Sequence, residues 1–137
     1  SGLLVVAKND EAHKSLASQI EKKTARRIYY GLCDGNFKED EGTVDKPIAR
    51  SKKDRKKMAI DSSGRRAVTH YKVLKRYGQY TLVRFELETG RTHHGQLLHA
   101  KELVLKHPHT DEIMRFECEL PQYFQAVLKK LDNKINN

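Results

Sequence analysis

With 137 residues, the chain can build one domain with a modest core, and it is too short for two ordinary domains. Its net charge of +9 and pI of about 9.6 favour a polyanionic partner, nucleic acid before an acidic membrane, although solubility alone could also explain the charge. No run approaches the ~20 apolar residues of a membrane span, and residues 3–7 are too short an apolar run for a signal peptide, so we expect a soluble cytoplasmic domain.

The first part of the chain predicts a strand, a helix and a second strand. Residues 3–7 form a continuous apolar run that indicates a buried strand. Asn9 is a favourable N-cap residue, and Asp10 and Glu11 suit the first helical turn. Residues 26–33 are rich in residues that favour strands. The helix should bury one face, made of Ala12, Leu16, Ala17 and Ile20.

The middle of the chain predicts a loop region followed by a β-hairpin. Residues 36–65 hold turn residues and the densest charge in the chain, so we expect little regular structure there. Residues 67–76 and 80–87 both alternate between apolar and polar side chains and are separated by a short turn, which is typical of a hairpin.

The last part of the chain predicts a strand pair and a helix. Residues 97–105 and 113–120 form the strands, and Pro121 suits the first position of a helix. The complete pattern predicts an α+β domain with a largely antiparallel sheet. The final helix should direct four apolar side chains inward, namely Phe124, Val127, Leu128 and Leu131.

The two cysteines, Cys33 and Cys118, lie far apart and lack the spacing of metal ligands. Both stand in apolar, strand-like runs, so we expect buried free thiols, although a disulfide stays possible. The histidines also match no compact metal motif, and we expect no metal site.

Residues 50–57 form a basic segment with six positive charges and one negative charge. Mutual repulsion keeps such a run in solvent, and a phosphate backbone would relieve that repulsion. Arg65 and Arg66 follow shortly after. No aromatic residue interrupts the basic segment, so it would hold phosphates without stacking bases. A solvated loop with no partner is the alternative.

Four segments carry motifs in a specific order. Residues 1–4 read Ser-Gly-Leu-Leu, and residues 27–35 begin Arg-Ile-Tyr and end in Gly. Residues 42–50 read Gly-Thr-Val-Asp-Lys-Pro-Ile-Ala-Arg, and residues 87–93 read Leu-Glu-Thr-Gly-Arg-Thr-His. In this order and spacing, over nearly the whole chain, they resemble the catalytic domain of RluA/RluD-type pseudouridine synthases.

The resemblance implies a pseudouridine synthase catalytic-domain fold, a mixed, mainly antiparallel sheet flanked by helices. It implies an isomerase that converts uridine to pseudouridine in structured RNA, with large-subunit ribosomal RNA as the expected substrate. No cofactor and no obligate protein partner would be required. Tyr29 falls on the family's active-site tyrosine, although a tyrosine in an apolar strand is also an ordinary core residue. The alternatives are a catalytically inactive RNA-binding domain on the same fold and a basic interaction domain with no RNA role.

The sequence departs from the family pattern at two catalytic positions. The aspartate of the family's first motif would stand just before Ser1, and the arginine of its Gln-Ile-Arg segment would follow His93. Instead, the residues after His93 resemble a segment that the family places well downstream. We therefore expect further segments before Ser1 and between His93 and Gly95, and we expect these 137 residues alone to be inactive. The candidate RNA-binding residues are Arg27, Arg50, Lys52, Lys53, Arg55, Lys56, Lys57, Arg65, Arg66, Arg91 and His93, although Arg91 could equally form an ordinary salt bridge.

Overall fold

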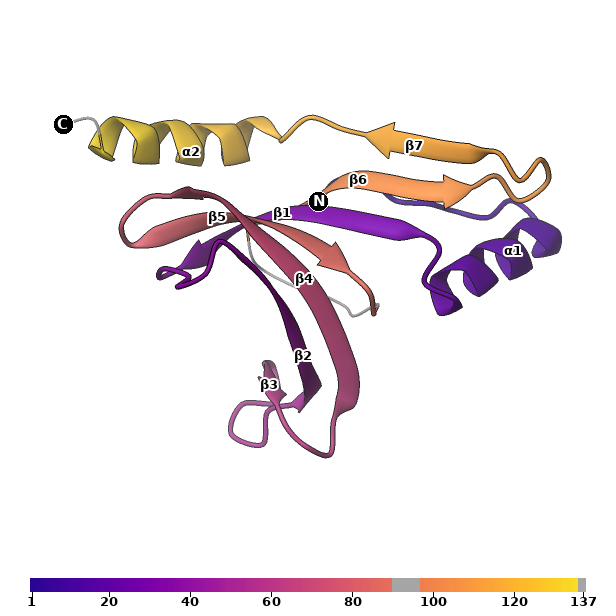
Figure 1. Ribbon diagram of the computed structural model, residues 1–137, viewed down its shortest axis with the longest axis horizontal. Coiled ribbons are helices and arrows are strands. Elements are labelled where there is room, and N and C mark those ends of the chain that lie inside the picture. The colour runs from indigo at the N-terminus through magenta and orange to yellow at the C-terminus, as the bar shows by residue number, and fades with distance from the viewer. Residues whose placement is uncertain (90–96, 136–137) are drawn as a thin grey trace.

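The protein folds around one curved antiparallel sheet, as a computed structural model shows (Figure 1). The structure describes residues 1–89 and 97–135. Within them the sheet has seven strands in the order β3-β2-β4-β5-β1-β6-β7, which confirms the predicted α+β class. The elements are α1 (Asp10–Glu21), β1 (Arg26–Asp34), β2 (Glu41–Arg50), β3 (Met58–Ile60), β4 (Arg65–Arg76), β5 (Tyr80–Leu87), β6 (Leu98–Lys106), β7 (Ile113–Glu117) and α2 (Gln122–Ile135).

Helix α1 begins where the sequence predicts, and of its predicted inward face Ala12 and Leu16 are half-buried, whereas Ala17 and Ile20 are exposed. Asn9 Oδ1 accepts a hydrogen bond from the Ala12 amide at 2.8 Å, so the predicted N-cap is confirmed. The buried residue of the helix is Gln19. Its side-chain Nε2 donates a hydrogen bond to the Lys106 carbonyl at the end of β6, and its Oε1 accepts one from the Lys106 amide. Ile20 is 40% exposed and Ala17 is also exposed, so their predicted burial is wrong.

The predicted buried strand at residues 3–7 is wrong. Leu4 is 86% exposed and Val6 is 74% exposed. Strand β7 pairs with β6 only from Glu102 to Lys106, which leaves the edge at Ala100 open. Among the described residues, the segment joins the sheet there by a single parallel bridge from Gly2 to Ala100, and the Leu3 amide donates to the Ala100 carbonyl at 3.1 Å. A Cβ at Gly2 would lie 2.4 Å from the Ala100 carbonyl oxygen, so this close approach requires glycine.

Residues 36–65 were expected to be loop-rich, and this prediction is also wrong. They contain the ten-residue β2 and the short β3. Strand β2 pairs with β4 from Glu41 opposite Lys72 to Ile48 opposite Arg65. Several side chains of β2 are exposed, and its sequence shows no clear alternation of apolar and polar residues. It is therefore recognised as a strand only by its pairing with β4. Strands β2 and β4 bend away from the rest of the sheet toward β3 (Figure 1).

The predicted hairpin, strand pair and final helix are all confirmed. Strands β4 and β5 pair across the expected turn, and β6 pairs with β7. Helix α2 inserts Phe124, which is fully buried, into a core with Tyr77 and Leu82. Leu82 lies opposite Leu32 of β1, so α2 covers the sheet face that Leu32 carries. No helix in the described ranges is long and apolar enough to cross a membrane.

Candidate functional site

Tyr29 lies in the middle of the sheet, on the face opposite to Leu32 and α2. On β1 it pairs with Phe85 of β5 on one side and with Ala100 of β6 on the other. Side chains that pair directly across strands share a face, so Tyr29 and Phe85 are neighbours. Gly31 permits the close packing beside them, because a Cβ there would lie 3.0 Å from both Leu98 and Phe85 side-chain atoms.

This face of the sheet holds an apolar hollow of about 280 Å³, which we call the Tyr29 cavity. Tyr29, Phe85 and Leu87 come from the central strands, and the curved β2–β4 arm supplies the opposite wall. A flat apolar ring would fit such a surface, since aromatic side chains offer π faces for stacking. The remaining lining residues are Val44, Lys46, Ile48, Ile60, Ala67, Thr69 and Leu98.

Arg27, a predicted RNA-binding residue, is half-buried beside Tyr29. Both residues line a second hollow of about 150 Å³ beneath residues 3–5. Arg27 Nε is buried and has no hydrogen-bond partner among the described residues. Arg27 therefore lies close to Tyr29 but is less accessible to a phosphate backbone than the exposed basic segment.

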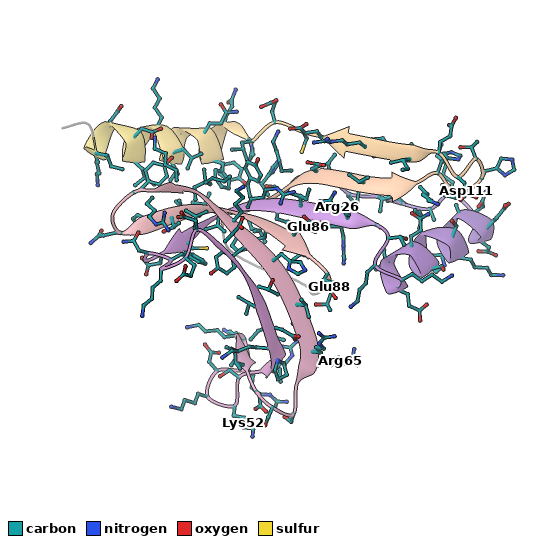
Figure 2. The ribbon with its side chains drawn as sticks, viewed as in Figure 1. Arg26, Lys52, Arg65, Glu86, Glu88 and Asp111 are labelled. Carbon is teal, nitrogen blue, oxygen red and sulfur yellow. The ribbon has the colours of Figure 1, made fainter. Side chains whose placement is uncertain are left out.

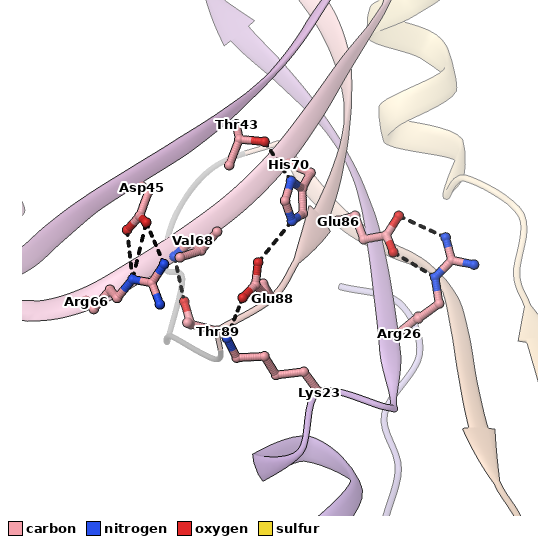
Figure 3. Close-up of polar contacts among 10 residues, drawn as sticks. All are labelled: Lys23, Arg26, Thr43, Asp45, Arg66, Val68, His70, Glu86, Glu88 and Thr89. Atoms are coloured by element: carbon pink, nitrogen blue, oxygen red, sulfur yellow. Dashed lines mark hydrogen bonds and ion pairs between the residues drawn. The ribbon is translucent and has the colours of Figure 1, made fainter.

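The sheet face opposite Tyr29 carries a set of charge pairs (Figure 3). Arg26 donates two hydrogen bonds to Glu86, at 2.7 and 3.0 Å. This guanidinium holds the pKa of Glu86 below its usual value. Glu88 accepts from Lys23 and lies 3.1 Å from His70 Nε2, and the hydrogen bond from Lys23 is the main reason that its pKa is lowered. The charges of Arg26 and Lys23 are therefore already neutralised by carboxylates within the protein.

The basic segment, residues 50–57, joins β2 to β3 at the end of the sheet arm. All six of its positive side chains are exposed, as the sequence predicts. Two of them form loose ion pairs, Lys52 with Asp61 at 3.7 Å and Lys57 with Asp54 at 3.8 Å. Figure 2 shows Lys52 at the tip of this arm and Arg65 at the start of β4. The basic segment thus projects from the edge of the sheet that also walls the Tyr29 cavity.

Arg65 and Arg66, predicted as a pair, point to opposite faces. Arg65 pairs with Ile48, which lines the Tyr29 cavity, so Arg65 belongs to the Tyr29 face. Arg66 belongs to the other face, where its Nη2 donates to Asp45 Oδ2 at 2.6 Å. The structure therefore brings only one of the two arginines to the face of Tyr29.

Two predicted residues, Arg91 and His93, lie outside the described residues. The motif at residues 87–93 is described only as far as Thr89, whose hydroxyl accepts a hydrogen bond from the Val68 amide at 2.9 Å. In residues 1–89 and 97–135, no group of three His, Cys, Asp or Glu side chains could hold a metal ion.

Sequence reasoning missed a polar cluster around the buried His99. Its Nε2 lies 3.1 Å from Cys118 Sγ, and its Nδ1 lies 3.1 Å from Ser1 Oγ. Burial lowers the pKa of His99, so the neutral ring is favoured in the fold. Both cysteines are free thiols as expected, but they are half-buried and not fully buried, and partial burial raises the pKa of Cys33. No sequence signal joins the His99 cluster, because Ser1 and Cys118 are far from His99 in the chain and reach it through contacts with β6, the bridge from Gly2 to Ala100 and the hydrogen bond from the Cys118 amide to Lys101.

Comparison with known proteins supplies the family. The family described as RNA pseudouridylate synthase matches residues 1–97. An uncharacterised RNA pseudouridine synthase of Bacillus subtilis strain 168 is 40% identical over 158 residues, covering 96% of this chain and 52% of the relative. Ribosomal large subunit pseudouridine synthase D of Nitrosomonas europaea is 35% identical over 168 residues, covering 97% and 48%.

A solved structure agrees with the fold. Human RNA pseudouridylate synthase domain containing 4 superimposes with a TM-score of 0.72 at 18% identity, covering 90% of this chain and 69% of that chain. The chain spans about half the length of the curated relatives it matches. The alignment of 158 positions with the Bacillus relative is longer than the 137-residue chain, so that relative carries residues with no counterpart here. From its sequence and its fold, this chain belongs to the RNA pseudouridine synthase family, of the RluA/RluD type.

Proposed function

We propose that this chain forms the catalytic domain of an enzyme that isomerises uridine to pseudouridine in structured RNA. Large-subunit ribosomal RNA is the proposed substrate, because several relatives carry the name ribosomal large subunit pseudouridine synthase D. Cytoplasm is then the proposed location. The observation that carries the proposal is that Tyr29, whose motif resembles that of the family's active-site tyrosine, lies in the wall of an apolar cavity beside an exposed basic segment.

The chemistry explains why such a cavity is needed. The reaction breaks the bond between C1′ and N1, rotates the uracil and joins C1′ to C5. C5 then loses its proton and N1 gains one, so there is no net redox change. The uridine must first leave the base stack, which costs a few kcal/mol. Stacking against Tyr29 and the neighbouring Phe85 would offset part of that cost. The Tyr29 hydroxyl is our candidate for assisting removal of the C5 proton.

The catalytic aspartate and its arginine partner are assigned to no residue of this chain. The family motifs that contain them have no complete counterpart among the 137 residues. We place them in segments that relatives carry and this sequence does not, which is consistent with alignments longer than the chain. These 137 residues alone are then expected to bind RNA without modifying it.

The basic segment, residues 50–57, is proposed to bind RNA phosphates. Its exposed cations can release counterions from the RNA, which gives affinity that falls steeply with salt. Because it contains no aromatic side chain, it would position the RNA while other parts of the site select the uridine.

The test is pseudouridine formation on large-subunit ribosomal RNA transcribed in vitro. The full-length protein is incubated with this RNA, and the nucleosides released by digestion are separated and quantified. Tyr29→Phe and Tyr30→Phe form a matched pair, because each removes one hydroxyl from adjacent positions on opposite faces of β1. We expect Tyr29→Phe to lower the rate by roughly 10²-fold or more, as for loss of a general acid–base group. Tyr30→Phe should stay near the wild-type rate.

Two results would contradict the proposal. If a protein that includes the family's aspartate motif forms no pseudouridine, the enzymatic assignment fails. If Tyr29→Ala retains full activity, Tyr29 neither stacks on the base nor assists proton transfer. A second candidate, a non-catalytic RNA-binding domain, is favoured by the missing catalytic motifs. It predicts salt-dependent RNA binding with no pseudouridine even from the full-length protein.

A further inference from the structure

Lys46 is the one charged residue among the described residues that line the Tyr29 cavity. The others are apolar or aromatic, apart from Thr69. A ligand that matches this arrangement has a flat, weakly polar ring with an anionic group beside it. A nucleotide has this chemistry, with its base as the ring and its phosphate as the anion.

The ammonium group of Lys46 has no ion-pair partner in the part of the chain that the structure describes. Lys46 stands on β2 opposite Ala67 of β4, and its side chain is exposed between Val44 and Ile48 on the same face. The preceding residue, Asp45, points to the other face and is bonded to Arg66. Strand alternation therefore separates Lys46 from the nearest carboxylate in the sequence.

On the face opposite Tyr29, three arginines are neutralised by carboxylates, whereas Lys72 has no ion pair among the described residues. Opposite Tyr29, Arg26 and Arg84 both contact Glu86, and Arg66 contacts Asp45. On the Tyr29 face, Arg65 resembles Lys46 in having no side-chain partner among the described residues. Phosphates gain most from cations that carry no internal counter-charge. Because Lys46, unlike the unpaired Lys72, lines the apolar Tyr29 cavity, charge and geometry together favour the Tyr29 face as the side that RNA approaches.

Lys46 and Arg65 also lie in line with the basic segment. Lys46 lies opposite Ala67 of β4, and Ala67 is two residues from Arg65 on that strand. Lys46 and Arg65 are therefore offset by roughly 7 Å along the strand direction. That separation is compatible with consecutive phosphates of one RNA strand. The row then continues into residues 50–57, because Arg50 ends β2 just beyond Ile48.

We propose that Lys46 binds the phosphate of the nucleotide whose base enters the Tyr29 cavity. Arg65 binds the next phosphate toward the basic segment, so the RNA strand crosses this face of the sheet. The inference rests on the proposed function, because it takes RNA as the substrate and the Tyr29 cavity as the place of the uridine.

The test compares Lys46→Ala, Lys46→Arg and Lys72→Ala in the full-length protein. Lys72 is the matched control, since it is an exposed lysine without a side-chain ion pair in the described residues, and it lies on the opposite face. Binding of a fluorescein-labelled RNA hairpin with a uridine-rich loop is measured over a series of KCl concentrations. Lys46→Ala should lower the slope of log affinity against log salt by about 1 and weaken binding about fivefold at ~0.1 M salt.

Lys46→Arg should retain the slope, because a guanidinium also binds phosphate, and Lys72→Ala should leave it unchanged. In the pseudouridine assay, Lys46→Ala should raise KM and leave kcat within about twofold, as expected for a contact made equally in ground and transition states. The proposal is overturned if Lys46→Ala keeps the wild-type slope, or if Lys72→Ala loses as much.

The two proposals can fail separately. If the wild-type protein makes pseudouridine and Lys46→Ala behaves like it, only the phosphate site is wrong. If the wild-type protein makes none but Lys46→Ala still loses one unit of salt slope, the isomerase function fails and the phosphate site remains. A wild-type protein that binds no RNA would overturn both.

Discussion

Replacing the three unpaired cations of the basic segment by alanine should weaken RNA binding, and the size of the loss follows from the number of phosphate contacts removed. Of the six cations, Lys52 and Lys57 are paired with carboxylates, and Arg50 donates to the Arg55 carbonyl. Lys53, Arg55 and Lys56 have no side-chain partner in the described residues. Each phosphate contact contributes ~0.7–0.9 to the salt slope, so the triple alanine variant should lose roughly 2 units and bind about 100-fold more weakly at ~0.1 M salt.

The assay is equilibrium binding of a labelled RNA hairpin across a salt series. The control variant replaces Lys14, Lys129 and Lys130 by Ala, which removes the same charge from exposed helix positions. Thermal unfolding should be nearly unchanged in both variants, because all six side chains are exposed. An unchanged salt slope in the basic-segment variant, or an equal loss in the control, would refute the reasoning that this segment binds RNA.

Three further outcomes are expected. Phe124→Ala should lower the free energy of unfolding by about 3–5 kcal/mol, because the fully buried ring leaves a cavity, and urea unfolding that changes by less than ~1 kcal/mol would contradict the core assignment. Burial lowers the pKa of His99 from its usual value of 6.5, so at mildly acidic pH the unfolded chain binds more protons than the folded chain. The free energy of unfolding should therefore be fully retained above about pH 6.5 and should fall as the pH drops below it. Urea unfolding between pH 7.5 and 5.5 should show this decline in the wild-type protein and a weaker one in His99→Gln, and equal declines would exclude His99 as its source. The intact mass of the purified natural protein should exceed 15.9 kDa if the catalytic aspartate and arginine lie in further segments, whereas a mass of 15.9 kDa would leave a protein that binds RNA without modifying it.

Elements with strong local signals were predictable from the sequence. Asn9 caps α1 through its own side chain, and α2 begins directly after Pro121, because both residues act on the backbone beside them. The β4–β5 hairpin follows from alternation on both sides of a short turn. Family membership also follows from the motifs, and the family match bears it out. That Tyr29 and Tyr30 point to opposite faces follows from the period of a strand.

Strand pairing decided what the sequence could not. Strand β2 is charged and carries Pro47, and it becomes a strand because β4 supplies its partner groups. Residues 3–7 are apolar, yet Leu4 and Val6 are exposed, because the segment joins the sheet only at its start, through the bridge from Gly2 to Ala100 seen in the described residues. The same pairing directs Lys46 into the wall that faces Tyr29 and separates Arg65 from Arg66. The sequence by itself determined the elements with strong local signals, namely both helices and the β4–β5 hairpin, and the family of the chain. Only the tertiary structure decided that β2 forms and which charges share a face with Tyr29, because strand pairing and register depend on contacts between distant segments.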